Sequence, residues 1–284
     1  MKTILLLTLF LLFTWQQSLA GDCVLAQKEY DKGLAAGKSG SWSLAKASLS
    51  RSTMECNTFN NWYLLGQVHQ QLNENDEAMA AYEDAQKYTK SNNERAFAIG
   101  RYAEVQAKIG EITRPLTLIH EARKMHSEPP KWMDDLALNL DSKRVHQPLT
   151  IAQVTKGLTN RSIKILNMDI KPSINVNINF KSNSTEVVDD SLSALDVLAK
   201  ALSEQSVANK QVTILGHADE RGSSKFNQDL SERRAKHIKE ELINRNPDLV
   251  NRLQIYGMGE ADPLYKGHSE KDHLFNRRIE LQIN

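Results

Sequence analysis

The sequence GHADERG occupies residues 216–222, and the string N-x-x-L-x-x-R-R-A follows at residues 227–235. Before the first motif, Val212 and Ile214 have the spacing of a strand that ends at Gly216. The two motifs therefore span the end of a strand, a loop and the first turns of a helix. The helix is predicted from four apolar residues at helical spacing: Leu230, Ala235, Ile238 and Leu242.

Further strands and another helix are predicted on either side of these motifs. Residues 174–180 alternate strictly between apolar side chains and asparagine, which is typical of a strand with one apolar face. Apolar residues at helical spacing follow over 192–202. Two more strands are predicted at 253–255 and 279–283, and Gly257-x-Gly259 between them is predicted to be a turn. The order β-α-β-α-β-β predicts a mixed sheet with helices on one face.

Residues 24–128 have a different composition, rich in Ala, Glu, Lys, Gln and Leu, which favours helices. A spacing of 33 residues relates Gly33 to Gly66 and Ala45 to Ala78. The pattern resembles tetratricopeptide repeats, in which small residues let two antiparallel helices approach closely. An unrelated helical bundle with accidental spacing is the alternative, and both interpretations predict a helical interaction or spacer module. Three positions depart from the residue that the repeat prefers: His69, Asn73 and Pro115.

These patterns predict an N-terminal helical part and a C-terminal α/β part. Two to three helical hairpins are expected before Pro129-Pro130, which ends them. Two helices are predicted in the connecting region, at 131–138 and 150–158. The predicted division of the chain is a signal peptide at 1–20, helical repeats at 21–128, a linker region at 129–173 and the β-α-β-α-β-β domain at 174–284.

The first twenty residues have the organisation of a secretory signal. Lys2 supplies the positive charge, Ile4–Phe13 is apolar except for Thr8, and Ser18-Leu19-Ala20 is a small-x-small cleavage site. The apolar run is too short for a comfortable membrane span, and no other stretch approaches 18 apolar residues. The mature chain is therefore expected to be exported without an integral membrane span.

The chain contains two cysteines, Cys23 and Cys56. In the oxidising compartment that export implies, they are expected to form a disulfide. Closing a loop of this length stabilises a chain by roughly 3 to 4 kcal/mol. The alternative is lipidation of Cys23, because LAGDC at residues 19–23 resembles a bacterial lipoprotein box, although Asp22 interrupts it.

Composition and motifs argue against several function classes. A net charge of +1, from 36 Lys and Arg against 35 Asp and Glu, argues against a nucleic-acid binder. Two cysteines exclude a four-cysteine zinc site, and no carboxylate set with useful spacing accompanies His268 and His273. The sequence has no Gly-x-Ser-x-Gly elbow, His-Glu-x-x-His pair or phosphate-loop glycine string. We therefore expect a protein that is not an enzyme and has no metal or cofactor.

Residues 174–284 resemble the OmpA-like peptidoglycan-binding domain family, most closely in its peptidoglycan-associated lipoprotein type. The resemblance rests on GHADERG, on the N-x-x-L-x-x-R-R-A string, and on a closing part with GMGE at 257–260 and NRRIE at 276–280. It implies a ligand, the peptide stem of peptidoglycan, and in particular its meso-diaminopimelate. The free end of that residue carries an ammonium and a carboxylate on one carbon.

Family correspondence implies a role for four residues in ligand binding. Asp219 accepts hydrogen bonds from the ammonium, and the planar guanidinium of Arg234 takes the carboxylate in a bidentate manner. Asn227 is implied as a positioning or hydrogen-bonding residue near the start of the helix. Arg278 is implied as a further residue that lines the pocket.

The resemblance and the signal together predict a non-enzymatic protein of the Gram-negative periplasm, associated with the cell wall and the outer membrane. The C-terminal domain would hold peptidoglycan, and the helical repeats would recruit an envelope protein, so that the chain tethers an envelope assembly to the wall. Two alternatives are open. One is an enzyme or regulator of envelope remodelling that the domain delivers to the wall, and the other is a domain used only for protein docking.

Overall fold

The computed structural model describes residues 23–159, 163–165, 168–181 and 184–284. The predicted signal peptide lies outside the described residues. The chain divides into two compact units. One holds the described residues up to Ile109 together with Ala122–Glu128, and the other holds Gly110–Glu121 together with the described residues from Pro129 to Asn284. The division predicted from the sequence, at residues 128 and 173, stays a prediction.

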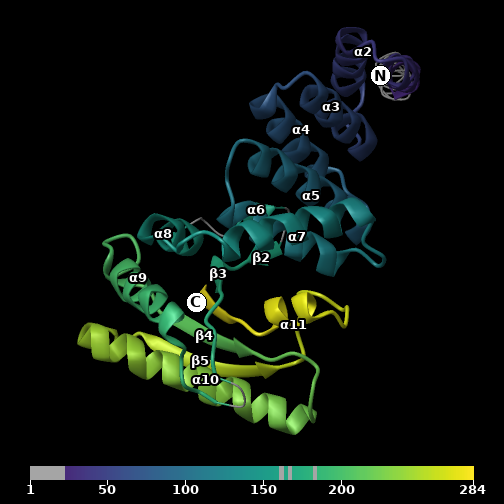
Figure 1. Cartoon of the computed structure of the whole chain (residues 1–284). Helices are drawn as coiled ribbons and strands as arrows, with labels where there is room; N and C mark the ends of the chain where they lie inside the picture. The colour runs from purple at the N-terminus through teal and green to yellow at the C-terminus, as the bar shows by residue number, and fades with distance from the viewer. Residues whose placement is uncertain (1–22, 160–162, 166–167, 182–183) are drawn as a thin grey trace, which may run out of the picture. The chain divides into compact units, whose positions relative to one another are not determined.

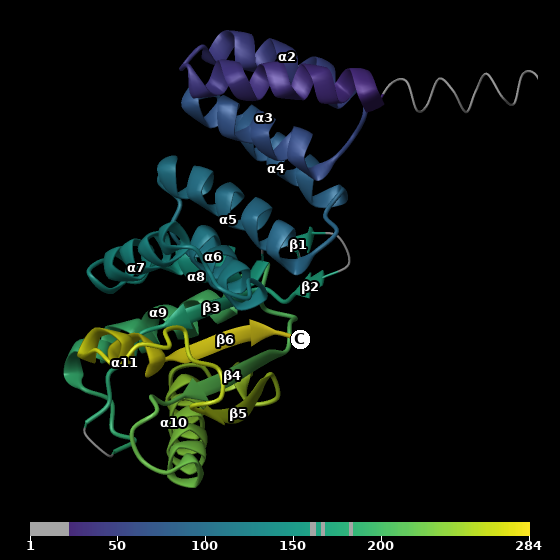
Figure 2. The same ribbon diagram turned by 90° about the vertical axis from the view of Figure 1, so that its right-hand side faces the viewer.

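The N-terminal unit is a series of helices joined by short turns (Figures 1 and 2). Its first helix covers residues 23–38. Each of the next four packs against its neighbour along the chain, which confirms the predicted helical fold. These four are α2 (Trp42–Glu55), α3 (Phe59–Gln71), α4 (Asn75–Lys87) and α5 (Asn92–Lys108).

Gly33 and Gly66 lie at equivalent helix contacts. A Cβ atom on Gly33 would lie 2.6 Å from Leu49 Cγ, and one on Gly66 would lie 2.7 Å from Tyr82 Cε1. Both distances are too short for a real Cβ atom, so each glycine admits a large side chain of the following helix. The contacts run from position 33 to 49 and from 66 to 82, so the 33-residue recurrence in the sequence is a recurrence of helix packing.

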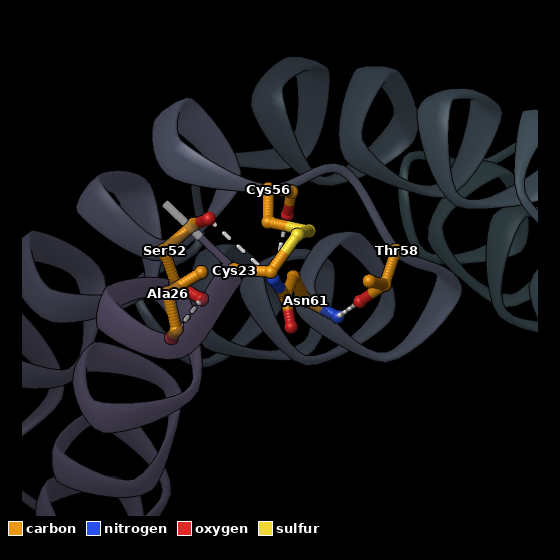
Figure 3. Close-up of a disulfide and its surroundings, with 6 residues drawn as sticks. All are labelled: Cys23, Ala26, Ser52, Cys56, Thr58 and Asn61. Atoms are coloured by element: carbon orange, nitrogen blue, oxygen red, sulfur yellow. Dashed lines mark hydrogen bonds between the residues drawn. A yellow bond between two sulfur atoms is a disulfide. The ribbon is translucent and has the colours of Figure 1, made fainter. Parts of the chain in front are cut away.

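The predicted disulfide between Cys23 and Cys56 is present and joins the first helix to the residue that follows α2 (Figure 3). Two hydrogen bonds lie next to it. Ser52 Oγ donates to the carbonyl oxygen of Ala26 over 2.7 Å, and Asn61 Nδ2 donates to the carbonyl oxygen of Cys56 over 2.8 Å. The crosslink and these bonds hold the first helix, α2 and the start of α3 together.

The C-terminal unit contains a four-stranded mixed sheet. The order across the sheet is β3 (Ser173–Val176), β6 (Ile279–Ile283), β4 (Val212–His217) and β5 (Leu253–Gly259). β4 and β5 are parallel, whereas β6 is antiparallel to both β3 and β4. The mixed sheet expected from the sequence is therefore confirmed.

Two helices cover one face of this sheet (Figure 1). α10 (Ser224–Arg245) packs on β4 and β5, and α9 (Leu192–Ser203) packs on α10. The chain order β3-α9-β4-α10-β5-β6 is the predicted one, with a short helix, α11 (Glu270–Asn276), added before β6. Apolar residues of the helices and strands form one core, including Leu195, Leu198, Leu202, Ile214, Ile238 and Leu281.

The region predicted as a linker contributes to the same core. Its two predicted helices are present as α7 (Lys131–Val145), which is longer than expected, and α8 (Ile151–Thr159). Val154 and Leu158 of α8 are fully buried among the core residues of the sheet domain. The remaining elements are α6 (Thr113–Met125), the antiparallel pair β1 (Ile163–Ile165) and β2 (Met168–Ile170), and two short 3-10 helices at Asp189–Ser191 and Pro247–Leu249.

Two predictions about the strands were wrong. The first strand ends at Val176 and not at residue 180, and Phe180 makes only an isolated bridge to Val187. The predicted turn at Gly257–Gly259 is part of β5. Its glycine has another purpose, because a Cβ on Gly257 would lie 2.7 Å from the backbone nitrogen of Glu232 on α10.

No helix within the described ranges has the length and apolar character needed to cross a bilayer. This finding concerns only the part of the chain from residue 23 onward, with its short gaps.

Candidate functional site

The GHADERG loop joins β4 to α10 and is held close to that helix. A Cβ on Gly216 would lie 2.1 Å from the carbonyl oxygen of Ser231, so only glycine allows α10 to pack this closely on β4. Ser223 begins the helix, because its Oγ accepts a hydrogen bond from the backbone nitrogen of Phe226 over 3.2 Å. The close packing brings Asp219 at the strand end and Arg234 on the helix to one cavity.

This cavity has a volume of about 400 Å³ and is lined by residues from four parts of the C-terminal unit. The four parts are the loop after β3, the GHADERG loop, the first turns of α10 and Arg277. Three arginines and a single aspartate supply the charged groups of the lining. The lining residues are Phe180, Ala218, Asp219, Arg221, Phe226, Asn227, Leu230, Arg234 and Arg277.

Asp219 is buried and carries a negative charge at neutral pH. Its carboxylate accepts hydrogen bonds from Arg221 Nη2 over 2.7 Å and from Arg277 Nη1 over 2.6 Å. Burial acts to raise the pKa of Asp219, but these hydrogen bonds outweigh burial and lower it to about 2.

Asn227 positions the loop. Its side-chain nitrogen donates to the carbonyl oxygen of Asp219 over 3.0 Å and also to the carboxylate of Glu260. The residue is almost fully buried. Asn227 therefore ties the start of α10 both to the loop and to the residue that follows β5, and its role in ligand binding stays a prediction.

Arg234 is buried beside the cavity and contacts a backbone oxygen and an aromatic ring. Its Nε donates to the carbonyl oxygen of Ser184 over 3.1 Å, and its guanidinium carbon lies 4.6 Å above the centre of the Phe180 ring. No carboxylate among the described residues forms an ion pair with it. Burial, with repulsion from Arg277 as a smaller cause, lowers the pKa of Arg234 to about 10, so the group is cationic at neutral pH.

The structure brings together three of the four predicted ligand residues and places the fourth elsewhere. Arg278 does not line the cavity. Its side chain is almost fully buried and donates to Asn175 Oδ1 over 3.0 Å and to the carbonyl oxygen of Asp262 over 3.2 Å. The neighbouring Arg277 lies at the cavity instead.

The alternation of β6 is the signal that separates these two arginines. Ile279, Leu281 and Ile283 are buried on the helix-covered face of the sheet. Side chains two residues apart lie on the same face of an extended chain. Arg277 therefore lies on the helix-covered face with Ile279, and Arg278 lies on the opposite face. No sequence pattern indicated that Phe180 and Phe226 line the cavity. Their positions there depend on where the loop after β3 and the start of α10 meet.

The histidines that the sequence analysis singled out pair with a carboxylate. His268 Nδ1 lies 2.8 Å from Glu220 Oε1, and His273 Nδ1 lies 3.4 Å from Glu220 Oε2. Over the residues whose placement is described, no group of three His, Cys, Asp or Glu side chains could hold a metal ion.

Comparison with known proteins identifies the C-terminal part of the chain. Residues 179–277 match the model of the OmpA family. These residues form an OmpA family domain. The domain covers about a third of the chain and includes the cavity residues from Phe180 to Arg277.

Two relatives and one solved structure show the extent of the similarity. The peptidoglycan-associated lipoprotein of Pseudomonas aeruginosa is 34% identical over 103 residues, which are 36% of this chain and 59% of the relative. Outer membrane porin F of the same organism is 26% identical over 110 residues, 39% of this chain and 31% of the relative. The crystal structure of the peptidoglycan-associated lipoprotein from Burkholderia pseudomallei is 27% identical with a TM-score of 0.34, covering 38% of this chain and 88% of that chain.

The similarity to these relatives covers little more than a third of this chain. The chain spans about three fifths of the first relative and about a third of the second. Their names refer to peptidoglycan association and to the outer membrane, in agreement with the predicted location in the cell envelope.

Proposed function

We propose that the OmpA family domain binds peptidoglycan non-covalently through the meso-diaminopimelate of its peptide stem, as a binding module and not as an enzyme. The observation that carries the proposal is the placement of Asp219 and Arg234 on one cavity. A zwitterionic group needs an anion and a cation held at a fixed separation. The family match and the name of the lipoprotein relative support peptidoglycan as the ligand.

The two charged groups have the properties that this ligand requires. Arg234 has no acidic partner among the described residues, so its guanidinium is available to a ligand carboxylate. Its planar fork can donate two parallel hydrogen bonds, and its burial strengthens them because water is largely excluded. Asp219, with a pKa of about 2, is ionised at any pH at which the domain is expected to work and can accept from an ammonium.

The rest of the chain is assigned a tethering role. The N-terminal helices, clamped by the Cys23–Cys56 disulfide, would recruit an envelope protein while the C-terminal domain holds the wall. In this proposal the segments 21–128, 129–173 and 174–284 are the recruiting, connecting and wall-binding parts. The protein would act in the periplasm, at the cell wall and the outer membrane.

Co-sedimentation with purified sacculi that contain meso-diaminopimelate tests the proposal. The mature chain is expected to pellet, and Asp219→Ala and Arg234→Ala are expected to stay in solution, because truncating one partner of a buried charge pair costs about 2 to 5 kcal/mol. Arg233→Ala is the matched control, since Arg233 is the exposed neighbour that pairs with Asp229 on the surface. It should pellet like the wild type.

The same assay separates the alternatives. A wild-type chain that stays in solution but captures an envelope protein would overturn wall binding in favour of protein docking. Release of soluble wall fragments by the wild type would favour an enzyme. Equal pelleting of all variants would place the binding surface away from the cavity.

A further inference from the structure

The carboxylate of Asp219 already has a full set of hydrogen-bond donors from this chain. Oδ1 accepts from the backbone nitrogen of Arg221 over 3.1 Å and from its Nε over 3.2 Å. Oδ2 accepts from Arg221 Nη2 over 2.7 Å and from Arg277 Nη1 over 2.6 Å. An ionised carboxylate has about four lone-pair positions. A ligand ammonium can therefore donate to Asp219 only after one of these donors has left.

Arg221 is the donor that can leave. Its side chain is 51% exposed, and its Nη1 already donates to Glu270 Oε1 over 2.9 Å. Glu270 is 80% exposed at the first residue of α11, outside the cavity lining. If the guanidinium swings away from Asp219, it keeps a carboxylate partner in Glu270.

The remaining donors hold Asp219 in place when the Arg221 side chain moves. The backbone nitrogen of Arg221 and Nη1 of Arg277 do not depend on the position of the Arg221 guanidinium. Asn227 continues to hold the carbonyl oxygen of Asp219. The movement therefore exposes two acceptor positions on a carboxylate whose backbone stays anchored.

We propose that Arg221 is an internal competitor for the ligand. Its guanidinium occupies the ammonium position of the empty site, and when a ligand binds it leaves Asp219 and keeps its bond to Glu270. This inference rests on the proposed function, and it adds a source of specificity. A ligand with both charges displaces Arg221 and engages Arg234, whereas a ligand with only a carboxylate leaves Arg221 in place and engages Arg234 alone.

With competition of this kind, the apparent affinity is the intrinsic affinity multiplied by the fraction of molecules whose site is open. If Arg221 occupies Asp219 in about nine molecules out of ten, removing it tightens binding by about tenfold. Removing Glu270 has the opposite effect, because the displaced guanidinium then loses its second partner. Removing Glu270 must therefore leave the ligand affinity unchanged in a chain that already lacks Arg221.

The test is calorimetric titration of the mature chain with the soluble tripeptide L-Ala-γ-D-Glu-meso-diaminopimelate. A second peptide, acetylated on the free ammonium of its meso-diaminopimelate residue, is titrated in parallel. The proteins are the wild type, Arg221→Gln, Glu270→Gln, the double variant, and Arg233→Gln as a control for loss of an exposed arginine. Thermal unfolding checks that each variant is folded.

The expected result is that Arg221→Gln binds the free tripeptide roughly threefold to tenfold more tightly than the wild type. Glu270→Gln binds more weakly, the double variant matches Arg221→Gln, and Arg233→Gln matches the wild type. The acetylated peptide gains nothing from Arg221→Gln, because it brings no cation to Asp219.

Weaker or unchanged binding by Arg221→Gln overturns the competitor and leaves the proposed function standing, with Arg221 then contacting the ligand or only shaping the loop. If the double variant binds the tripeptide more weakly than Arg221→Gln does, the competitor role of Arg221 is also overturned. If neither the wild type nor Arg221→Gln binds the free tripeptide, the proposed function fails, and the inference fails with it.

Discussion

Arg277 Nη1 lies 2.6 Å from Asp219 Oδ2, although the two residues are 58 positions apart in the sequence. The next residue, Arg278, points to the other side of the sheet and is buried against Asn175 and Asp262. Two adjacent arginines of one motif thus have separate surroundings. One belongs to the cavity, and the other belongs to a buried polar cluster that includes Glu280.

The two arginines are expected to differ in their effect on stability. Arg278→Ala should lower the free energy of unfolding by about 3 to 5 kcal/mol, because it leaves the largely buried Glu280 without its cation. Arg277→Ala should lower the free energy of unfolding by less than about 1 kcal/mol. The Arg277 side chain is one-third exposed, so solvent partly screens its ion pair with Asp219. Urea unfolding of both variants measures the difference, and equal losses would contradict the assignment.

Glu280 is expected to contribute to stability in a pH-dependent way. Burial acts to raise its pKa, but the neighbouring His217, 3.5 Å away, and the charge of Arg278 lower it from 4.5 to about 2. Because the folded-state pKa is depressed, the stabilisation is complete above about pH 4.5 and is lost as the pH falls toward 2. The loss amounts to about 3 kcal/mol.

The measurement compares wild type with Glu280→Gln by urea unfolding at pH 6, 4 and 3. The gap between the two unfolding free energies should be widest at pH 6 and should narrow steadily as the pH falls. A gap that does not change with pH would show that the carboxylate charge is not the source.

A pair of glycine substitutions tests the helix contacts of the N-terminal unit. Gly66→Ala should destabilise the unit, because the new Cβ would lie 2.7 Å from the buried ring of Tyr82. Gly37→Ala should stabilise it by about 0.5 to 1 kcal/mol, since that Cβ would meet Trp42 at an ordinary 3.6 Å and alanine favours helix. Thermal melts that shift in opposite directions are the expected outcome; a shared direction would contradict the contact.

The disulfide is expected to contribute through the length of the loop that it closes. Cys23→Ser with Cys56→Ser should lower the free energy of unfolding by roughly 3 to 4 kcal/mol. The wild type measured with and without a reductant provides the matched comparison. An unchanged unfolding midpoint on reduction would show that buried bonds such as Ser52 to Ala26 suffice.

Arg234→Lys tests whether the shape of the cation matters as well as its charge. A lysine ammonium cannot reproduce the two parallel hydrogen bonds of the guanidinium, so binding to sacculi should weaken by about tenfold or more, equivalent to about 1.4 kcal/mol. Sedimentation over a range of salt concentrations measures it. Wild-type affinity in this variant would mean that only the charge is read.

Local patterns in the sequence predicted most of the elements. The helices before residue 128, the strand at Val212 to Gly216 and the helix after it follow from periodicities that the backbone itself imposes, 3.6 residues for a helix and 2 for a strand. The pairing of Cys23 with Cys56 followed from there being only two cysteines. The family resemblance implied Asp219, Asn227 and Arg234, and these three residues lie within one strand-loop-helix unit, where short separations limit where each side chain can be.

Tertiary structure alone decided the features that depend on distant segments. The sequence did not show that β6 lies between β3 and β4, that Gly257 makes room for α10 inside a strand, or that Arg221 and Arg277 both contact Asp219. The physical reason is the same in each case. Packing and hydrogen bonding between segments tens of residues apart fix the surroundings of a side chain, whereas local periodicity fixes only the element that carries it.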